Sequence, residues 1–322
     1  MQYLYWARLG GFYFINKRLI LLNDLKIATT LLVKFLTYSM GKLKTIAVML
    51  VLVIAFACKK SSTNNNNNNP PPPPPPPPVT FDWKFDSVVT WSDEFSTDGV
   101  VDNTKWSYDV GGSGWGNNEL EYYTSGLNDS VKNGILYIVA KKESYGGKGY
   151  TSARIATRNK GDWTYGRFEI RAKIPKGRGT WPAIWMLPTD NMYGGWPNSG
   201  EIDIMEDVGY DLNNMHFTLH ALDFYGGNGK GAAKFIADAS DAFHKYRLDW
   251  TSYGIRGFID DQQIFEYLNP GTGPKDWPFN EKFHVLLNLA IGGSWGGAQG
   301  VDDTIFPTMM AVDYVRVYKF IK

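Results

Sequence analysis

The sequence predicts an all-β fold of two packed antiparallel sheets for residues 80–322. Short segments in this region mix β-branched and aromatic residues, alternate in polarity, and are separated by turns rich in Gly, Asn and Asp. A sustained 3.6-residue hydrophobic period is missing, apart from a turn near residues 237–243. Regular short strands joined by turns favour a sandwich, because each sheet must bury one apolar face.

The strand pattern is clearest in four segments, residues 134–140, 167–173, 244–250 and 255–259. Asp260-Asp261 directly follows the last of them, before Gln262. Aspartate tolerates turn conformations, so the pair predicts a hairpin turn.

Residues 1–79 differ in composition from the rest of the chain. Charges interrupt the apolar stretches of residues 1–39, which we interpret as an over-extended gene start, with translation beginning at Met40. Residues 40–58 have the basic and hydrophobic parts of a secretory signal and end at Cys58. The Asn and Pro tracts of residues 59–79 predict a disordered, partly rod-like linker.

Cys58 is the only cysteine in the chain, so it cannot form an intramolecular disulfide. Its position resembles a bacterial lipoprotein box, in which the cysteine is lipidated after cleavage. This likeness predicts an exported lipoprotein held by a lipid anchor at the outer membrane, cell surface or periplasm. The alternative is an incidental cysteine in a discarded signal peptide.

The composition limits the partners. A net charge of +1 provides no basic field for nucleic acid. Aromatic residues make up 15% of the chain, with 12 tryptophans, which fits an aromatic-lined binding surface. We expect a monomer.

Residues 201–206 (EIDIME) place three carboxylates in one strand-like run. Burying them is costly, and crowding raises their pKa values, as a general acid requires. Regular alternation puts Glu201 and Asp203 on one face and Glu206 on the other. A β-bulge at Ile204-Met205 would bring all three acids onto one face. The alternatives are solvated edge-strand acids or an ion-pair network.

With such a bulge the Cα atoms of Glu201 and Glu206 lie roughly 13 Å apart, at about 3.3 Å per residue. Two extended side chains can close this to the roughly 5–5.5 Å between carboxyl groups of a retaining glycosidase. Three tryptophans, Trp181, Trp185 and Trp196, precede the acids, and flat aromatic faces suit sugar rings.

The run from Trp196 to Glu206 resembles the active-site signature of glycoside hydrolase family 16, in the bulged variant of laminarinase-type endo-β-1,3-glucanases. Further matching segments follow in the family's order: residues 91–95, 115–124, 150–155, 165–175, 288–293 and 312–318. The resemblance covers about residues 80–320. It implies a catalytic domain at residues 80–322, folded as a β-jelly roll with the active-site cleft on its concave face.

The resemblance also implies roles. Glu201 is expected to be the nucleophile, Glu206 the acid/base and Asp203 the helper that modulates both. The expected reaction is retaining, endo-acting hydrolysis of laminarin-like β-1,3-glucan, with no cofactor required for catalysis. Expected substrate-binding residues are Trp181, Trp185, Trp196, Asn118, Glu119, Arg154, His220 and Trp295. For Arg154 an ion pair is an equal alternative, and for His220 a structural role. Trp83, Trp91, Trp106 and Trp250 are assigned to packing or edges.

The family commonly holds a structural calcium, for which the matching positions are Glu94, Gly134 and Asp313, with oxygen donors suited to a hard cation. The alternative is a salt bridge between Asp313 and Arg316 or Lys319. Two other functions stay open: a non-catalytic β-glucan-binding protein, and a family enzyme acting on mixed-linkage β-glucan or a marine galactan.

Overall fold

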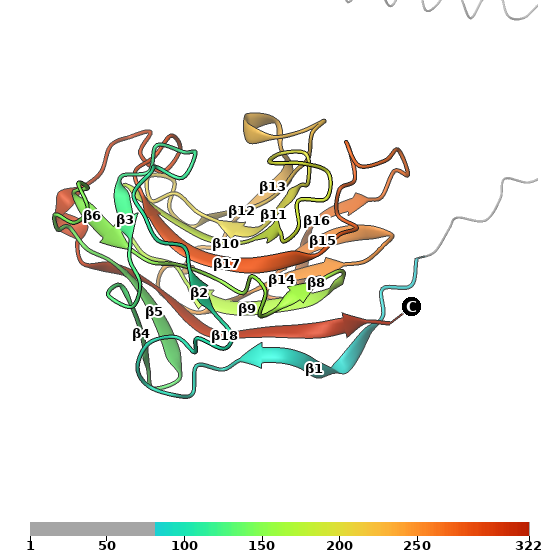
Figure 1. Cartoon of the computed structure of the whole chain (residues 1–322), viewed down its shortest axis with the longest axis horizontal. Coiled ribbons are helices and arrows are strands. Elements are labelled where there is room, and N and C mark those ends of the chain that lie inside the picture. Colours follow the sequence, from blue (N-terminus) through green and yellow to red (C-terminus); the bar gives the residue numbers. More distant parts are fainter. Residues whose placement is uncertain (1–80, 322) are drawn as a thin grey trace, which may run out of the picture. The chain divides into compact units, whose positions relative to one another are not determined.

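A computed structural model of the chain describes residues 81–321 (Figure 1). The predicted leader, the lipidation site Cys58 and the linker lie outside the described residues. Among the residues that are described, none belongs to a helix long and apolar enough to cross a bilayer.

The first sheet, here called the outer sheet, has the order β16-β15-β14-β9-β18-β5-β4, with β1 added on β18. All of its pairs are antiparallel. Its strands are β1 (Phe85–Asp93), β4 (Asp129–Lys132), β5 (Ile135–Ala140), β9 (Gly166–Lys173), β14 (His244–Trp250), β15 (Gly254–Ile259), β16 (Gln262–Leu268) and β18 (Thr308–Phe320).

The second sheet, here called the cleft sheet, has the order β13-β12-β11-β10-β17-β7-β2, with β8 added on β17. Its strands are β2 (Ser107–Tyr108), β7 (Arg154–Ala156), β8 (Asp162–Trp163), β10 (Thr180–Pro188), β11 (Glu201–Glu206), β12 (Asn214–His220), β13 (Lys230–Phe235) and β17 (Phe283–Ile291). In Figure 1 it lies above the outer sheet, and loops rise at both ends of its open face.

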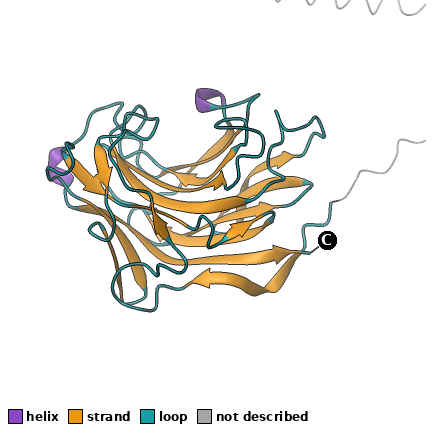
Figure 2. Ribbon diagram, viewed as in Figure 1, coloured by secondary structure: helices purple, strands orange, loops and turns teal. Residues whose placement is uncertain are grey.

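The remaining regular structure is small. Strands β3 (Glu121–Tyr123) and β6 (Tyr150–Ser152) form a parallel pair. Two single-turn 3₁₀ helices, η1 (Gly226–Asn228) and η2 (Asp303–Ile305), are the helical segments among residues 81–321 (Figure 2). The described domain is therefore the two-sheet β-sandwich that the sequence predicts.

The predicted strands are confirmed as β5, β9, β14 and β15, with ends that agree within one residue. Asp260 and Asp261 have φ angles of 48° and 66° between β15 and β16. Positive φ at both central residues is the signature of a tight hairpin turn, so the predicted turn is confirmed.

The core lies between the sheets because each strand alternates its side chains. In β9 every second residue is buried, including Phe168 and Ile170, which are fully inaccessible. Each such side chain contributes about 1.5–3 kcal/mol by leaving water. β17 is buried along its whole length, since it lies at the centre of the cleft sheet.

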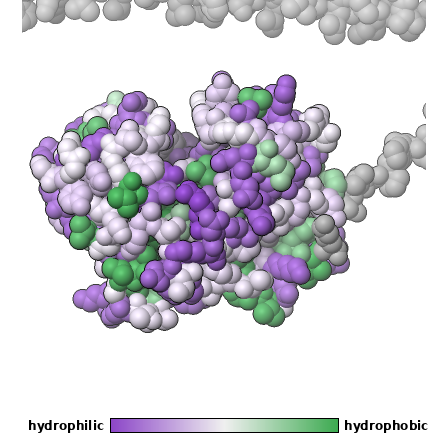
Figure 3. All heavy atoms as spheres, viewed as in Figure 1, coloured by the Kyte–Doolittle hydropathy of each residue, from purple (hydrophilic) through white to green (hydrophobic). Residues whose placement is uncertain are grey.

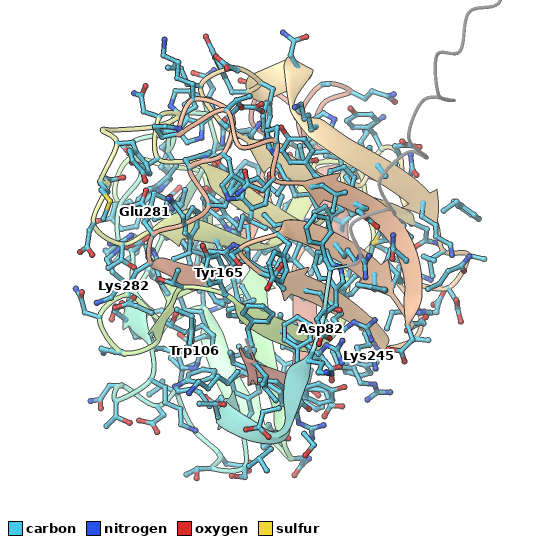
Figure 4. The ribbon with its side chains drawn as sticks, turned by 90° about the vertical axis from the view of Figure 1, so that its right-hand side faces the viewer. Asp82, Trp106, Tyr165, Lys245, Glu281 and Lys282 are labelled. Atoms are coloured by element: carbon cyan, nitrogen blue, oxygen red, sulfur yellow. The ribbon has the colours of Figure 1, made fainter. Side chains whose placement is uncertain are left out.

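The tryptophans assigned to packing do pack. Trp106 and Trp250 are buried, and Trp91 contacts the core and meets Trp106 edge-on. Tyr165 meets Trp250 edge-on. Figure 4 labels Trp106 and Tyr165 among the side chains of the domain.

Candidate active site

Strand β11 carries the predicted bulge. On one side, the neighbours Ile184 and Trp185 of β10 pair with Met205 and Asp203, so Ile204 is the extra residue. On the other side, β12 pairs Thr218 with Asp203 and His216 with Glu206, and the register shifts between them. The alternation is therefore reset between Asp203 and Glu206, and the bulge prediction is confirmed.

Because of the bulge, Glu201, Asp203 and Glu206 all face one cleft of about 980 Å³. Figure 3 shows a hollow between the two raised groups of loops. The strands beside β11 contribute every second residue to the lining, as side-chain alternation requires. These residues are Trp181, Ala183, Trp185 and Leu187 on β10, and His216, Thr218 and His220 on β12.

Each acid has its own polar neighbour. The indole N–H of Trp181 donates to Glu206 Oε1 at 3.0 Å, and that of Trp196 donates to Glu201 Oε2. His220 lies opposite Glu201 in the ladder, and its Nε2 is 3.1 Å from Asp203 Oδ2. One carboxyl oxygen each of Glu201 and Asp203 and one ring nitrogen of His220 lie within 4.8 Å of one another.

Burial is the main cause of the raised pKa values in this cluster. It raises the pKa of Glu201 to about 8, with Asp203 adding to the effect, and that of Glu206 to about 7, with Glu201 adding. The pKa of Asp203 rises well above its usual range because of burial and the charge of Glu206. At neutral pH the cluster therefore carries fewer than three charges, and its protons belong to the group as a whole.

The cleft walls are aromatic. Beside Glu206, the ring of Trp295 meets the rings of Trp181 and His216 edge-on, with centroids 5.6 Å and 5.0 Å apart, respectively. Toward Glu201, Trp196 is 53% exposed and meets Tyr225 edge-on. The acids therefore lie between two aromatic groups, of which the one at Trp196 is exposed, and such flat faces suit sugar rings.

One wall continues through Arg154, whose guanidinium lies 4.7 Å from the rings of both Trp115 and Trp185. Arg154 also donates to Asp109 at 3.0 Å, so it both lines the cleft and forms the ion pair expected as its alternative. Glu119 lines the same wall, and its carboxylate accepts from Tyr123 at 2.9 Å.

Comparison with known proteins assigns the fold and site to a family. A sequence model described as "Glycosyl hydrolases family 16" matches residues 116–316. The chain belongs to glycosyl hydrolase family 16. It is therefore a glycosyl hydrolase by family, and the expected jelly-roll architecture is that of its structural neighbours.

Three relatives illustrate the similarity. The chain is 49% identical to a beta-glucanase of Rhodothermus marinus over 245 residues, which cover 73% of this chain and 86% of the relative. The solved structure of the laminarinase from Rhodothermus marinus superposes with a TM-score of 0.72 at 48% identity. The match covers 74% of this chain and 99% of the laminarinase. The structure of a non-specific endo-beta-1,3(4)-glucanase with a bound glucan oligosaccharide superposes with a TM-score of 0.71 at 41% identity. The match covers 76% of this chain and 98% of the glucanase.

The structure brings together all but one of the predicted cleft residues. Asn118 does not itself line the cleft: it has a φ of 59°, and its amide donates at 3.0 Å to Ser294, which does line it. Its neighbour Asn117 lines the cleft instead. The role of Asn118 in substrate binding stays a prediction.

The lining residues that the sequence interpretation missed include Trp115, His216 and Asn288. His216 and His220 are four residues apart on β12, so strict alternation would have placed them on one face. Asn288 is the first residue of the matching segment 288–293, and its amide oxygen accepts from Trp185 Nε1 at 2.7 Å.

Glu94 and Asp313, the predicted calcium ligands, each contact an arginine. Both oxygens of Glu94 accept from Arg316, at 2.9 and 2.7 Å, and Asp313 accepts from Arg171. The alternative pairing of Asp313 is thus realised with Arg171 rather than Arg316 or Lys319. Strand register nevertheless places Gly134 and Glu94 near Asp313, since Leu136 pairs with Val312 and Asp93 with Val315. The calcium site stays a prediction.

Proposed function

We propose that this chain hydrolyses β-1,3-glucan internally, with retention of anomeric configuration. The observation that carries the proposal is the bulged strand β11, which presents Glu201, Asp203 and Glu206 together in an aromatic cleft. Family membership supports the retaining double displacement. The relatives named as laminarinase and beta-glucanase support the substrate class.

In the first step the Glu201 carboxylate attacks the anomeric carbon, and Glu206 gives its proton to the departing glycosidic oxygen. The Trp196 N–H and the charge of His220 both favour the ionised form of Glu201, which attack requires. In the second step Glu206, now ionised, removes a proton from water. That water breaks the bond to Glu201 and releases the sugar as the same anomer.

The test is release of reducing ends from a panel of laminarin, curdlan, lichenan, agarose and carrageenan. Laminarin and curdlan should be cleaved by the wild type and left intact by Glu201→Ala. Wild-type binding to laminarin without cleavage would instead support a non-catalytic glucan-binding protein. Cleavage of agarose or carrageenan alone would overturn the assignment of the glycan.

A second candidate substrate is mixed-linkage β-glucan. It is favoured by the similarity to the structure of a non-specific endo-beta-1,3(4)-glucanase with 1,3-beta-D-cellobiosyl-glucose at its active site. The lichenan member of the panel tests it, because a strict β-1,3 enzyme would leave lichenan uncut.

We further propose export and lipidation at Cys58, supported by the signal-like residues 40–58. Metabolic labelling with a radioactive fatty acid should mark the wild type but not Cys58→Ala. Mature protein that retains residues before Cys58 would contradict the proposal.

A further inference from the structure

Two carboxyl groups, those of Glu119 and Glu121, lie close together beneath the cleft wall. Glu121 is completely buried, and Glu119 is 5% exposed where it lines the cleft. Two carboxylates this close cannot both be ionised at low cost. One of them must therefore hold a proton, and the hydrogen bonds around the pair identify which.

Glu119 stands at the end of a directed chain of donors. The Trp185 indole can only donate, so the amide oxygen of Asn288 faces it at 2.7 Å. The amide nitrogen of Asn288 then donates to the Tyr123 hydroxyl at 3.1 Å. The Tyr123 proton is thereby committed to Glu119 Oε2, 2.9 Å away.

The other oxygen of Glu119 accepts from the amide of Asn117 at 3.2 Å. Both oxygens of Glu119 therefore receive donors, which is the environment of an ionised carboxylate. Glu119 is the acceptor of the pair.

Glu121 has the opposite environment. Its Oε2 accepts from the backbone N–H of Ile291 at 2.6 Å. Its Oε1 is buried and receives no hydrogen bond from the part of the chain that is described, residues 81–321. A proton on Oε1, donated to Glu119, satisfies both groups at once.

We propose that Glu119 and Glu121 share one proton, held on Glu121, and that Glu121 is a positioning residue which fixes two walls of the cleft against each other. One wall is the segment of residues 115–119, which presents Glu119. The other begins at Ile291 and carries Trp295. The two segments also meet where Ser294 N donates to Asn117 O at 2.6 Å. The functional part of this inference rests on the proposed hydrolysis of β-glucan.

The pair is sensitive to alkaline pH. The charged and titratable groups that face it are Tyr123 on β3, Arg154 on β7, and Lys148, whose ammonium donates to the Glu119 carbonyl at 2.9 Å. Arg154 is already engaged by Asp109. Burial and the charge of Glu119 raise the pKa of Glu121 well above its usual range. The stability that Glu121 contributes is thus complete below its ordinary pKa and is lost as pH rises through its folded pKa.

The test uses the full-length chain and two replacements. Glu121→Gln keeps an acceptor for Ile291 and a permanent donor for Glu119. Glu121→Leu removes both. Glu266→Gln, on the outer sheet, is a matched control in which a carboxylate that pairs with Arg256 is neutralised. KM and kcat on laminarin, and the melting temperature, are measured from pH 5 to 10.

We expect the wild-type KM to rise at alkaline pH while that of Glu121→Gln stays flat. Glu121→Leu should raise KM about tenfold at every pH, because one charge-assisted hydrogen bond is lost. It should affect kcat less. The melting temperature should fall more steeply with alkaline pH in the wild type and the control than in Glu121→Gln. Parallel curves for the wild type and Glu121→Gln would overturn the proposal.

The melting curves need no substrate, so they test the shared proton even if Glu121→Leu fails to fold. If the wild type cleaves no β-glucan, the proposed function fails while the melting curves still decide the acid pair.

Discussion

Replacing Trp181 by Phe should move the pH dependence of the first chemical step. The indole N–H of Trp181 donates to Glu206 Oε1 at 3.0 Å and lowers the pKa of Glu206, which burial otherwise raises. Phenylalanine keeps an aromatic ring against Trp295 but has no donor. Without the donor the ionised form of Glu206 is less stable, so its pKa rises.

The magnitude follows from the strength of the lost bond. A hydrogen bond to a charged group contributes about 1.5–3 kcal/mol, and one pKa unit corresponds to about 1.4 kcal/mol. Water in the open cleft replaces part of the bond, so a rise of about one unit is expected. Glu206 acts as the acid only while protonated, and its pKa is about 7. The alkaline limb of kcat/KM should therefore move to higher pH, by up to about one unit.

The assay is kcat/KM on laminarin between pH 5 and 9.5. Trp83→Phe is the matched control, because Trp83 packs under Arg256 of the outer sheet and its Nε1 makes no hydrogen bond to residues 81–321. An alkaline limb that stays in place in Trp181→Phe, or moves to lower pH, would refute the role of Glu206 as the acid.

Three further predictions address other groups. Glu206→Gln should lower kcat on laminarin by about 10²–10⁴-fold in steady-state assays but spare activated aryl glycosides, whose leaving groups need no proton. Equal slowing on both substrates would count against Glu206 as the acid. Burial raises the pKa of Asp207 to about 8, so its contribution to stability is lost as pH rises from about 4 through 8; melting curves should show Asp207→Asn resisting alkali better than the wild type. Adding calcium should raise the melting temperature of the wild type but not of Asp313→Ala, and an equal response in both would remove Asp313 from the site.

Much of the active strand could be predicted from the sequence. Side-chain alternation alone separates Glu201 from Glu206, so a shared site requires a bulge between them, and the structure places one at Ile204-Met205. The same alternation on β12 predicts His216 from His220 once one of them is assigned to the cleft.

The rest depends on contacts between distant parts of the chain. Glu121 meets Ile291 across 170 residues, so its hydrogen bond to the other cleft wall has no local signal in the sequence. The amide of Asn118 meets Ser294 across 176 residues, a contact that the local sequence does not indicate. The partners of Glu94 and Asp313 likewise depend on which arginines the outer sheet brings beside them.

Laminarin hydrolysis followed by proton NMR tests the central claim most directly. Attack by Glu201 followed by attack of water inverts the anomeric carbon twice. We therefore predict that the β-anomer of the new reducing end appears first and that the α-anomer follows only by mutarotation. Initial appearance of the α-anomer would contradict a nucleophilic Glu201 and with it the proposed mechanism.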